Sequence, residues 1–393
     1  MVRKVLSNTV GARNPYAVAE LKLHKKINWR KKTPESKIRI LEKAFERPYH
    51  ELFDPRFSNS LFPQKTDPRF EQILSGAGDT VSCVPNPCPA IENWTPVTSG
   101  KITPDAVSYD DLVQGCLPDC YFISALSALA WALQTKGRFQ TNVVTYPYKY
   151  TFYSPKRDAA GSILLNALPG QDSPVYVDDK IPVLKPEIKI YSRSNTAIET
   201  WPCLYEKAYA AWQHCKKFNL DPADTTIKPD YIHICQGNPV TALMHLTGKI
   251  PTYFYTSGMT GATIYNYIGS QASPLPASPV IRLQTNYPAV AWTHNPSDPT
   301  DVIPANVFYR DDVIVANHSY TVLGTSPLNG KKYIVLRNPW GQKSGDPIRG
   351  ILADPAFATG SWLGKKLEDP ADGIFALDAD VFQQYFAGFG WVK

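Results

Sequence analysis

Apolar and polar positions follow two different rhythms along this chain, and the change falls near residue 250. Before that point, apolar residues recur at the three- and four-residue spacing of a helix, which predicts helices over about 119–134, 203–217 and 239–246. The first of these has small residues between its leucines, which is typical of a helix buried on most sides. Alternating stretches between the first two helices predict a small sheet: YKYTFYS and SPVYVDDKIPV.

After residue 250 the apolar runs are short, β-branched and separated by turn residues, which predicts a mostly antiparallel sheet. The fold class is therefore α+β, with a helix-rich first half and an antiparallel β-rich second half. We divide the chain into a basic, Pro-rich extension and linker (1–95), a helix-rich subdomain (96–250) and a β-rich subdomain (251–393). The strand candidates of the last are PVIRLQT, AVAWTH, NVFYRDDVIVA, HSYTVLG and KKYIVLRNPWG.

Charge changes this picture only at the N-terminal end. Residues 1–50 carry 13 basic and 4 acidic side chains, although the whole chain has a formal charge of only +6. We interpret this extension as a solvated or inhibitory segment; contact with acidic lipids or nucleic acid is the alternative. Because no nucleic-acid-binding motif is found, no nucleic-acid partner is expected. The chain has no apolar signal core and no membrane-spanning run, so it is predicted to be cytoplasmic.

The chemistry of the chain centres on one of its seven cysteines. An odd number of cysteines at irregular spacing argues against a complete disulfide framework. Cys120 falls in the first turn of the predicted helix, where Asp119 is expected to cap the free amides and the helix dipole is expected to lower the pKa of the thiol. The Asp119 charge opposes that effect. Gln114, six residues upstream, can donate to an oxyanion together with the Cys120 N–H. The alternative is a buried structural thiol.

A predicted hairpin supplies a base for this thiol. Asn329-Gly330 is a turn signal, and His318 and Asn338 lie ten residues either side of Leu328, so the hairpin brings them together. An Asn carbonyl can hold one imidazole nitrogen and leave the other to face a thiol. Trp340 is placed to cover that bond. Considered alone, His318 also fits a hydrogen-bonded polar residue of a strand with no catalytic role. Asn338-Pro339 alone also fits an ordinary turn.

The order Cys, His, Asn is that of papain-like cysteine peptidases. Three segments carry a closer resemblance, to the calpain-type peptidases: Gln114–Phe122, HSYTVLG and LRNPWG. The likeness covers roughly residues 95–393 and implies a papain-like fold of two subdomains with the active-site cleft between them. By this resemblance Cys120 is the nucleophile and His318 the general acid/base. Asn338 would orient the imidazole, and Gln114 would complete the oxyanion hole.

The resemblance implies a cysteine endopeptidase that hydrolyses protein substrates through an acyl-thioester. Two departures support an alternative from another class, a catalytically inactive calpain-like binding or scaffold protein: Pro118 stands where the family has Gly, and Tyr121 replaces its Trp. Selective modification of Cys120 by a thiol-directed peptide electrophile separates the two hypotheses.

No cofactor is expected for the chemistry, but calcium is a possible regulator. Asp111 and Glu206 match one calcium site of the calpains, whereas at the second site Asp372 matches and Ile374 and Ser344 do not. No EF-hand pattern is present. The other candidate metal ligands are not spaced as the ligands of a closed zinc site are. They are Cys116 with Cys120, or His233, Cys235 and His245.

Overall fold

The computed structural model describes a little more than half of the chain. The described residues are 10–12, 14, 88, 91, 93–96, 107–132, 147–154, 171–185, 188–195, 199–274, 283–298, 301–309, 314–328, 330–341, 361–362, 365–366 and 373–393. Most of the predicted extension and linker, 1–95, lies outside the described residues.

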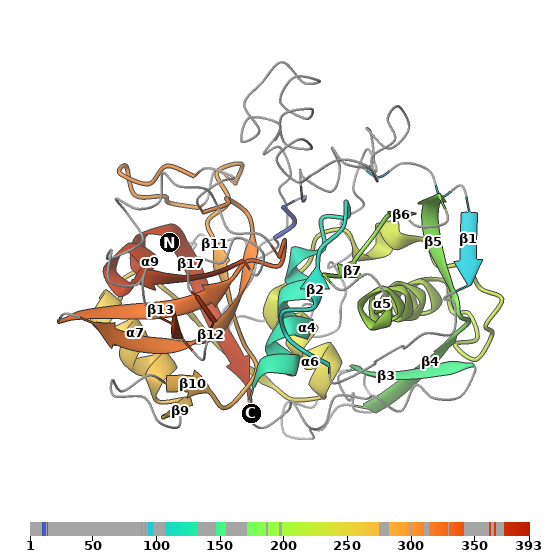
Figure 1. Cartoon of the computed structure of the whole chain (residues 1–393), viewed down its shortest axis with the longest axis horizontal. Coiled ribbons are helices and arrows are strands. Elements are labelled where there is room, and N and C mark those ends of the chain that lie inside the picture. Colours follow the sequence, from blue (N-terminus) through green and yellow to red (C-terminus); the bar gives the residue numbers. More distant parts are fainter. Residues whose placement is uncertain are drawn as a thin grey trace, which may run out of the picture.

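One buried helix stands between two differently built halves (Figure 1). This helix, α4, spans Cys120–Trp131, and every one of its residues is buried. The predicted helix over 119–134 is thereby confirmed, with its C-terminal end three residues earlier. Asp119 is the N-cap residue but makes no side-chain capping bond, so its predicted capping role is wrong. Its carboxyl group is directed to Glu206 instead.

The first half contains the two other predicted helices. α5 spans Trp201–Phe218, begins with a proline in its first turn and ends at Asn219 in the left-handed conformation. α6 spans Pro239–Thr247, and the Asn238 side chain caps it by accepting from Thr241 N. Both predictions are confirmed. A short 3₁₀ helix, η3, covers Tyr231–Ile234.

Small antiparallel sheets surround α5 on the first half (Figure 1). The predicted alternating stretches form β3 and β4, which pair with each other, and β5. The strands are β1 (Asn93–Pro96), β2 (Leu112–Val113), β3 (Tyr148–Ser154), β4 (Gln171–Val177), β5 (Lys180–Lys185), β6 (Ile188–Lys189) and β7 (Arg193–Ser194). They form the sheets β1-β5-β6, β2-β7 and β3-β4.

The second half contains an antiparallel sheet of eight strands, in the order β16-β13-β12-β11-β17-β8, with β10 paired to β12 and β9 paired to β10. The strands are β8 (Pro251–Tyr255), β9 (Ala272–Pro274), β10 (Leu283–Thr285), β11 (Ala289–Thr293), β12 (Ser319–Leu328), β13 (Lys331–Arg337), β16 (Ile374–Asp378) and β17 (Phe386–Val392). β14 (Ser361–Trp362) and β15 (Lys365–Lys366) form a separate pair. The predicted antiparallel, β-rich second half, and with it the α+β class, is confirmed.

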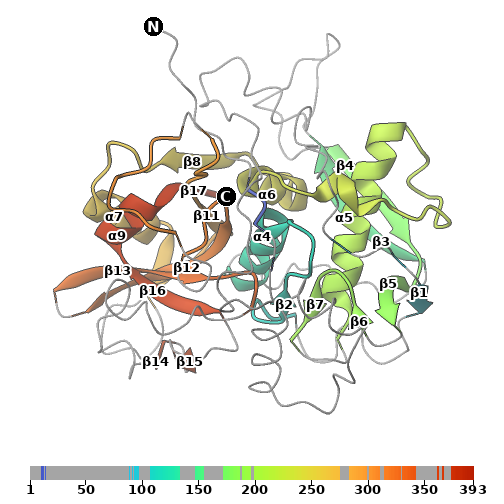
Figure 2. The same ribbon diagram turned by 90° about the horizontal axis from the view of Figure 1, so that it is seen from above.

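Two helices that the apolar pattern did not predict pack on this sheet. α7 spans Gly261–Gly269 and α9 spans Ala379–Tyr385. They bury Ile264, Ile268 and Phe382 against the sheet in one apolar cluster, and Figure 2 shows them side by side. One predicted strand, NVFYRDDVIVA, is not a strand where the structure describes it. Ile314 there is fully buried from a loop, which explains the misleading apolar pattern.

The halves are fastened together through α4 and the β12–β13 hairpin. Trp131 Nε1 donates to Leu323 O at 2.7 Å, and Thr321 Oγ1 donates to Ser124 O at 2.8 Å. Buried Arg337 donates from the sheet to the loop before α4, with Leu112 O at 2.6 Å. These bonds fix α4 against the sheet, so the N-terminus of the helix is held next to the start of β12. Among the described helices, none is both long and apolar enough to cross a bilayer.

Candidate active site

The thiol of Cys120 lies where the two halves meet. As the first residue of α4 it is fully buried, and its sulfur is hydrogen bonded by the backbones of Ser319, at the start of β12, and Ala12. Burial raises the pKa of Cys120 to about 12, and the Asp119 charge acts in the same direction. The predicted lowering of this pKa is wrong for this arrangement, because loss of water outweighs the helix dipole.

His318 immediately precedes β12 and is held by Asn338, at the end of β13. His318 Nε2 and Asn338 Oδ1 are 2.9 Å apart. The amide oxygen can only accept, so Nε2 carries the proton and Nδ1 keeps a free lone pair. Nδ1 is buried and has no hydrogen-bond partner among the described residues. Burial lowers the pKa of His318 to about 3. The ring is thus neutral, with its basic nitrogen unused.

The predicted hairpin explains this pairing. β12 and β13 pair from Leu328–Lys331 to Thr321–Arg337, with one bulge between Val322 and Gly324. Asn338 Oδ1 also accepts from Trp340 N at 3.1 Å, and the Trp340 ring lies 4.9 Å from the imidazole ring. Trp340 is almost completely buried. It therefore covers the His–Asn bond, as the sequence predicted.

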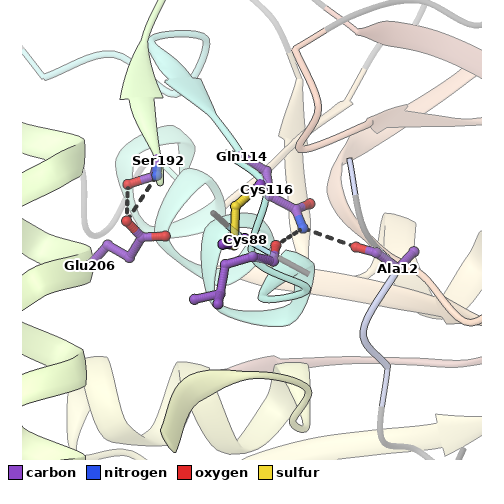
Figure 3. The surroundings of a disulfide bond; sticks show 7 residues. Ala12, Cys88, Gln114, Cys116, Ser192 and Glu206 are labelled. Carbon is purple, nitrogen blue, oxygen red and sulfur yellow. Dashed lines mark hydrogen bonds between the residues drawn. A yellow bond between two sulfur atoms is a disulfide. The ribbon is translucent and has the colours of Figure 1, made fainter. Parts of the chain in front are cut away.

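Gln114 reaches the same junction from the loop before α4 (Figure 3). Its Nε2 donates to Leu117 O at 2.6 Å and to Ala12 O at 2.9 Å. Its backbone N donates to Pro339 O at 2.9 Å, which ties the loop to the sheet half beside Asn338. The structure thus brings all four predicted residues to the same junction.

A disulfide that the sequence did not predict braces this loop. Cys88 and Cys116 are joined, and the bond lies directly beside Gln114 (Figure 3). The pairing rules out Cys116 as a metal ligand in this state. The other described cysteines are not disulfide-bonded: Cys120, Cys203, Cys215 and Cys235.

Two buried carboxyl groups, those of Asp119 and Glu206, lie beside Cys120. Glu206, on α5, makes a hydrogen bond with the Asp119 carboxyl group, and its Oε2 accepts from Ser192 N at 2.8 Å and Ser192 Oγ at 2.9 Å. Burial raises the pKa of Glu206 to about 7, against those hydrogen bonds. Near neutral pH the pair therefore shares a proton, and the Asp119 charge facing Cys120 depends on it.

The two carboxyl groups predicted for the first calcium site both accept hydrogen bonds within the protein in this arrangement. Asp111 Oδ2 accepts from Ser108 N at 2.8 Å and Trp201 Nε1 at 3.3 Å, and Glu206 is occupied by Ser192. In the part of the chain that the structure describes, no three His, Cys, Asp or Glu side chains are grouped to hold a metal. Of the second predicted site only Ile374 is described, buried in β16; Asp372 and Ser344 lie outside the described residues.

Residues 10–12 also lie at the junction between the two halves. The apolar pattern of the sequence did not predict this. Val10 pairs with Gly237, Gly11 N donates to Asn317 O at 3.1 Å, and Ala12 is bonded by Gln114. Asn14 Nδ2 donates to Gln114 O at 2.7 Å. The only feature of the sequence that marks these residues is a run of small side chains inside an otherwise basic segment. The run itself has neither helical nor strand spacing.

Comparison with known proteins agrees with this geometry. A thiol protease of Porphyromonas gingivalis is 28% identical over 292 residues, which cover 71% of this chain and 53% of that protein. Calpain-13 of Rattus norvegicus is 24% identical over 289 residues, covering 72% of this chain and 37% of that protein. Calpain-5 of Mus musculus is 30% identical over 149 residues, covering 37% and 20%. The chain thus spans about half the length, or less, of the curated relatives it matches.

The match to the family as a whole is broader than any one of these likenesses. The profile of the calpain family of cysteine proteases covers residues 96–387, from the strand before the nucleophile loop to the last strand of the sheet. It includes both halves and all four residues gathered at the junction. With its papain-like pair of subdomains and the thiol between them, this chain belongs to the calpain family of cysteine proteases.

Proposed function

We propose that this chain is a cysteine endopeptidase that hydrolyses peptide bonds of protein substrates through an acyl-thioester. One observation carries the proposal: Asn338 holds Nε2 of His318 and leaves Nδ1 bare, while the next residue, Ser319, bonds the sulfur of Cys120. This arrangement supports a role for His318 Nδ1 as the base of the Cys120 thiol at the N-terminus of α4.

The roles follow from this arrangement. Cys120 attacks the substrate carbonyl carbon, and His318 Nδ1 takes the thiol proton and passes it to the leaving amine. Asn338 is a positioning residue that keeps the proton on Nε2. Gln114 Nε2, with the Cys120 backbone N–H, donates to the oxyanion. Water then attacks the thioester, and His318 returns the proton to the sulfur.

The neutral state of the pair is tied to burial. With the junction closed by residues 10–12, burial sets the pKa of Cys120 to about 12 and that of His318 to about 3, so neither is charged at neutral pH. When the segment leaves and water enters, the desolvation that causes both shifts falls. The proposal therefore expects the reactive thiolate only in the opened protein.

The test is cleavage of casein and of a peptide by the full chain and by Cys120→Ala. Cys203→Ala, which removes a buried thiol from α5, is the matched control. We expect cleavage by the wild type and the control, no cleavage by Cys120→Ala, and selective labelling of Cys120 by a peptide electrophile. Wild-type protein that neither cleaves nor is labelled would instead be the inactive binding protein.

The same assay, run with calcium and with chelator, addresses regulation. Because Asp111 and Glu206 are occupied by protein donors, we propose that the chemistry itself needs no calcium. We expect equal cleavage rates with calcium and with chelator once residues 10–12 have left the junction. A cleavage rate that collapses in chelator would contradict this proposal.

The compartment also enters the proposal. A disulfide such as Cys88–Cys116 persists in oxidising surroundings and is rare in the cytosol. It favours an oxidising compartment over the predicted cytoplasm. The test is mass spectrometry of protein taken from its native source and alkylated without reduction. We expect both cysteines to be unmodified by the alkylating agent. Two alkylated thiols would instead support the cytoplasm.

A further inference from the structure

Ser319, the first residue of β12, contacts α4 at two points. Its backbone N–H donates to the Cys120 sulfur, since a hydrogen bond that lowers the pKa of a thiol is one donated to the sulfur. Its hydroxyl oxygen lies 2.6 Å from that of Ser124, and either can be the donor. Cys120 and Ser124 are four residues apart, so they lie on the same face of the helix. One residue of the sheet therefore holds two successive turns of the helix that carries the nucleophile.

The face of β12 that meets α4 is polar at this end, and Figures 1 and 2 both show the strand beside the helix. Side chains alternate between the two faces of a strand, so Ser319 and Thr321 both face α4. Thr321 Oγ1 donates to Ser124 O at 2.8 Å. Tyr320 and Val322 lie on the other face, in the apolar cluster to which α7 and α9 contribute. Ser124 is thus bound to the strand through both its side chain and its backbone.

The backbone of the histidine is fixed to the sheet half immediately before this contact. His318 precedes Ser319 in the chain, and its N donates to Thr293 Oγ1, on β11, at 2.9 Å. Thr293 N donates back to His318 O at 3.0 Å. A shift of α4 along β12 would therefore carry the Cys120 sulfur past an imidazole whose backbone stays in place. The contacts that set the position of α4 on β12 also set the geometry of the thiol and its base.

The pair of hydroxyl groups contributes position more than stability. Ser124 and Ser319 are both fully buried, and each has a carbonyl acceptor in its own half. Ser124 Oγ donates to Tyr121 O at 3.2 Å, and Ser319 Oγ donates to Ala291 O at 3.4 Å, so loss of one serine leaves the other hydroxyl satisfied. Alanine at both positions would fill the contact by apolar packing, which is non-directional. The 2.6 Å contact instead fixes one position of the helix along the strand.

We propose that Ser124 is a positioning residue of the active site. Through the hydroxyl group of Ser319 it sets the position of α4 on β12, and with it the alignment of the Cys120 sulfur with the His318 imidazole. This rests on the proposed peptidase function and adds a pair of residues on which that function depends. Both serine hydroxyl groups act through Cys120 and His318, and neither takes part in the bond changes.

The first test is steady-state kinetics of the full chain on a peptide, with Ser124→Ala, Ser319→Ala and the double variant. Each should lower kcat by about 10- to 30-fold with KM changed by less than about twofold, because a misplaced reacting group slows the chemical step and not binding. The double variant should be no slower than either single variant, since all three break the same contact.

Ser127→Ala is the matched control. Ser127 is also fully buried and on α4, but its hydroxyl donates to Tyr109 O at 2.9 Å, within the helix half. Its loss removes a buried hydrogen bond of the same helix without touching β12, so kcat should stay at the wild-type value. An equal loss of kcat in Ser127→Ala would reduce the role of Ser124 to general support of the helix and overturn the proposal.

The other outcomes separate this inference from the function on which it rests. Losses of kcat that multiply in the double variant would show that the two serines act independently, and a rise in KM at constant kcat would show an effect on binding; either result overturns the proposal. If the wild type cleaves casein and Ser124→Ala keeps its full kcat, the inference fails and the peptidase function stands. A wild type that neither cleaves nor is labelled would refute both.

The second test needs no substrate: the rate at which iodoacetamide alkylates Cys120, followed by mass spectrometry. This rate follows the fraction of thiolate, which depends on an imidazole aligned to receive the proton. It should fall by about tenfold in Ser124→Ala and Ser319→Ala and stay unchanged in Ser127→Ala, while urea unfolding midpoints fall no further in the first two than in the control. Alkylation at the wild-type rate, or a rate that falls only in step with the unfolding midpoint, would overturn the proposal.

Discussion

The two halves of the molecule place their functional groups by different means. On the sheet half, His318 and Asn338 are positioned by the backbone register of β12 and β13. On the helix half, Gln114 and Cys120 depend on a loop held by a disulfide and on a buried carboxyl pair. Regular backbone pairing survives the loss of one side chain, whereas a loop held by side chains does not. Single substitutions should therefore be felt most on the helix half.

Among substitutions that leave the Cys120 thiol in place, the largest effect is expected at Gln114. Gln114→Ala removes the proposed donor to the oxyanion and should lower kcat by about 10² to 10³ with little change in KM. Gln271→Ala, which removes a partly exposed amide on the sheet half, is the control and should have no effect. Steady-state kinetics on a peptide measures both. A loss below tenfold would mean that the donor to the oxyanion lies elsewhere.

The disulfide comes next, and its effect is on stability. Replacing Cys88 and Cys116 together by Ser opens a loop closed across 28 residues, which should lower the free energy of unfolding by about 3 kcal/mol. Cys215→Ala, a free buried thiol on α5, serves for comparison and should cost about 1 kcal/mol. Urea unfolding followed by fluorescence gives both values. Equal losses of unfolding free energy in the two variants would show that the Cys88–Cys116 disulfide does not stabilise the loop.

The buried carboxyl pair predicts how stability depends on pH. Burial raises the pKa of folded Glu206 from 4.5 to about 7, so the folded state holds a proton that the unfolded state releases. Its contribution is fully present below about pH 4.5 and is lost as pH rises through 7, by about 3 kcal/mol.

Glu206→Gln should remove that loss, so that stability between pH 5 and 8 becomes flatter than in the wild type. Urea unfolding at both pH values measures the slope, with Asp380→Asn, on the exposed side of α9, as the control. An unchanged slope would mean that Glu206 stays ionised. If calcium bound here, adding it would stabilise the wild type and not Glu206→Gln.

The same two halves show how much of the structure the sequence predicted. Helical spacing placed Cys120 at the start of α4, and the Asn-Gly turn placed His318 opposite Asn338, because both patterns are local. The partner of Cys116 and the Glu206–Asp119 pair were missed, since each joins residues brought together only by folding. The pKa of Cys120 was predicted with the wrong sign, because a helix start is visible in sequence and burial is not.

The N-terminal segment shows the same limit from the other side. Its charge suggested an inhibitory extension, yet the residues that enter the junction are the uncharged Val10–Ala12. They fit because Gly11 has no side chain where Gln236 stands, a fact about shape that composition does not carry. α7 and α9 were missed because their apolar faces are short and complete only against the sheet.

The smallest effect is expected at Asn338, on the sheet half. Asn338→Ala removes the acceptor of His318 Nε2, one hydrogen bond of 2.9 Å, and should lower kcat/KM by about tenfold. The loss is small because other contacts keep the imidazole in place. Thr293 Oγ1 accepts from His318 N at 2.9 Å, Thr293 N donates to His318 O at 3.0 Å, and Trp340 covers the ring.

Asn338→Asp is the informative companion, since it keeps an acceptor at the same place and adds a charge that raises the pKa of His318. Its pH–rate profile should shift to higher pH while kcat/KM stays above that of Asn338→Ala. If instead Asn338→Ala were as damaging as Gln114→Ala, strand register would not be what holds the histidine, and the contrast between the halves would disappear.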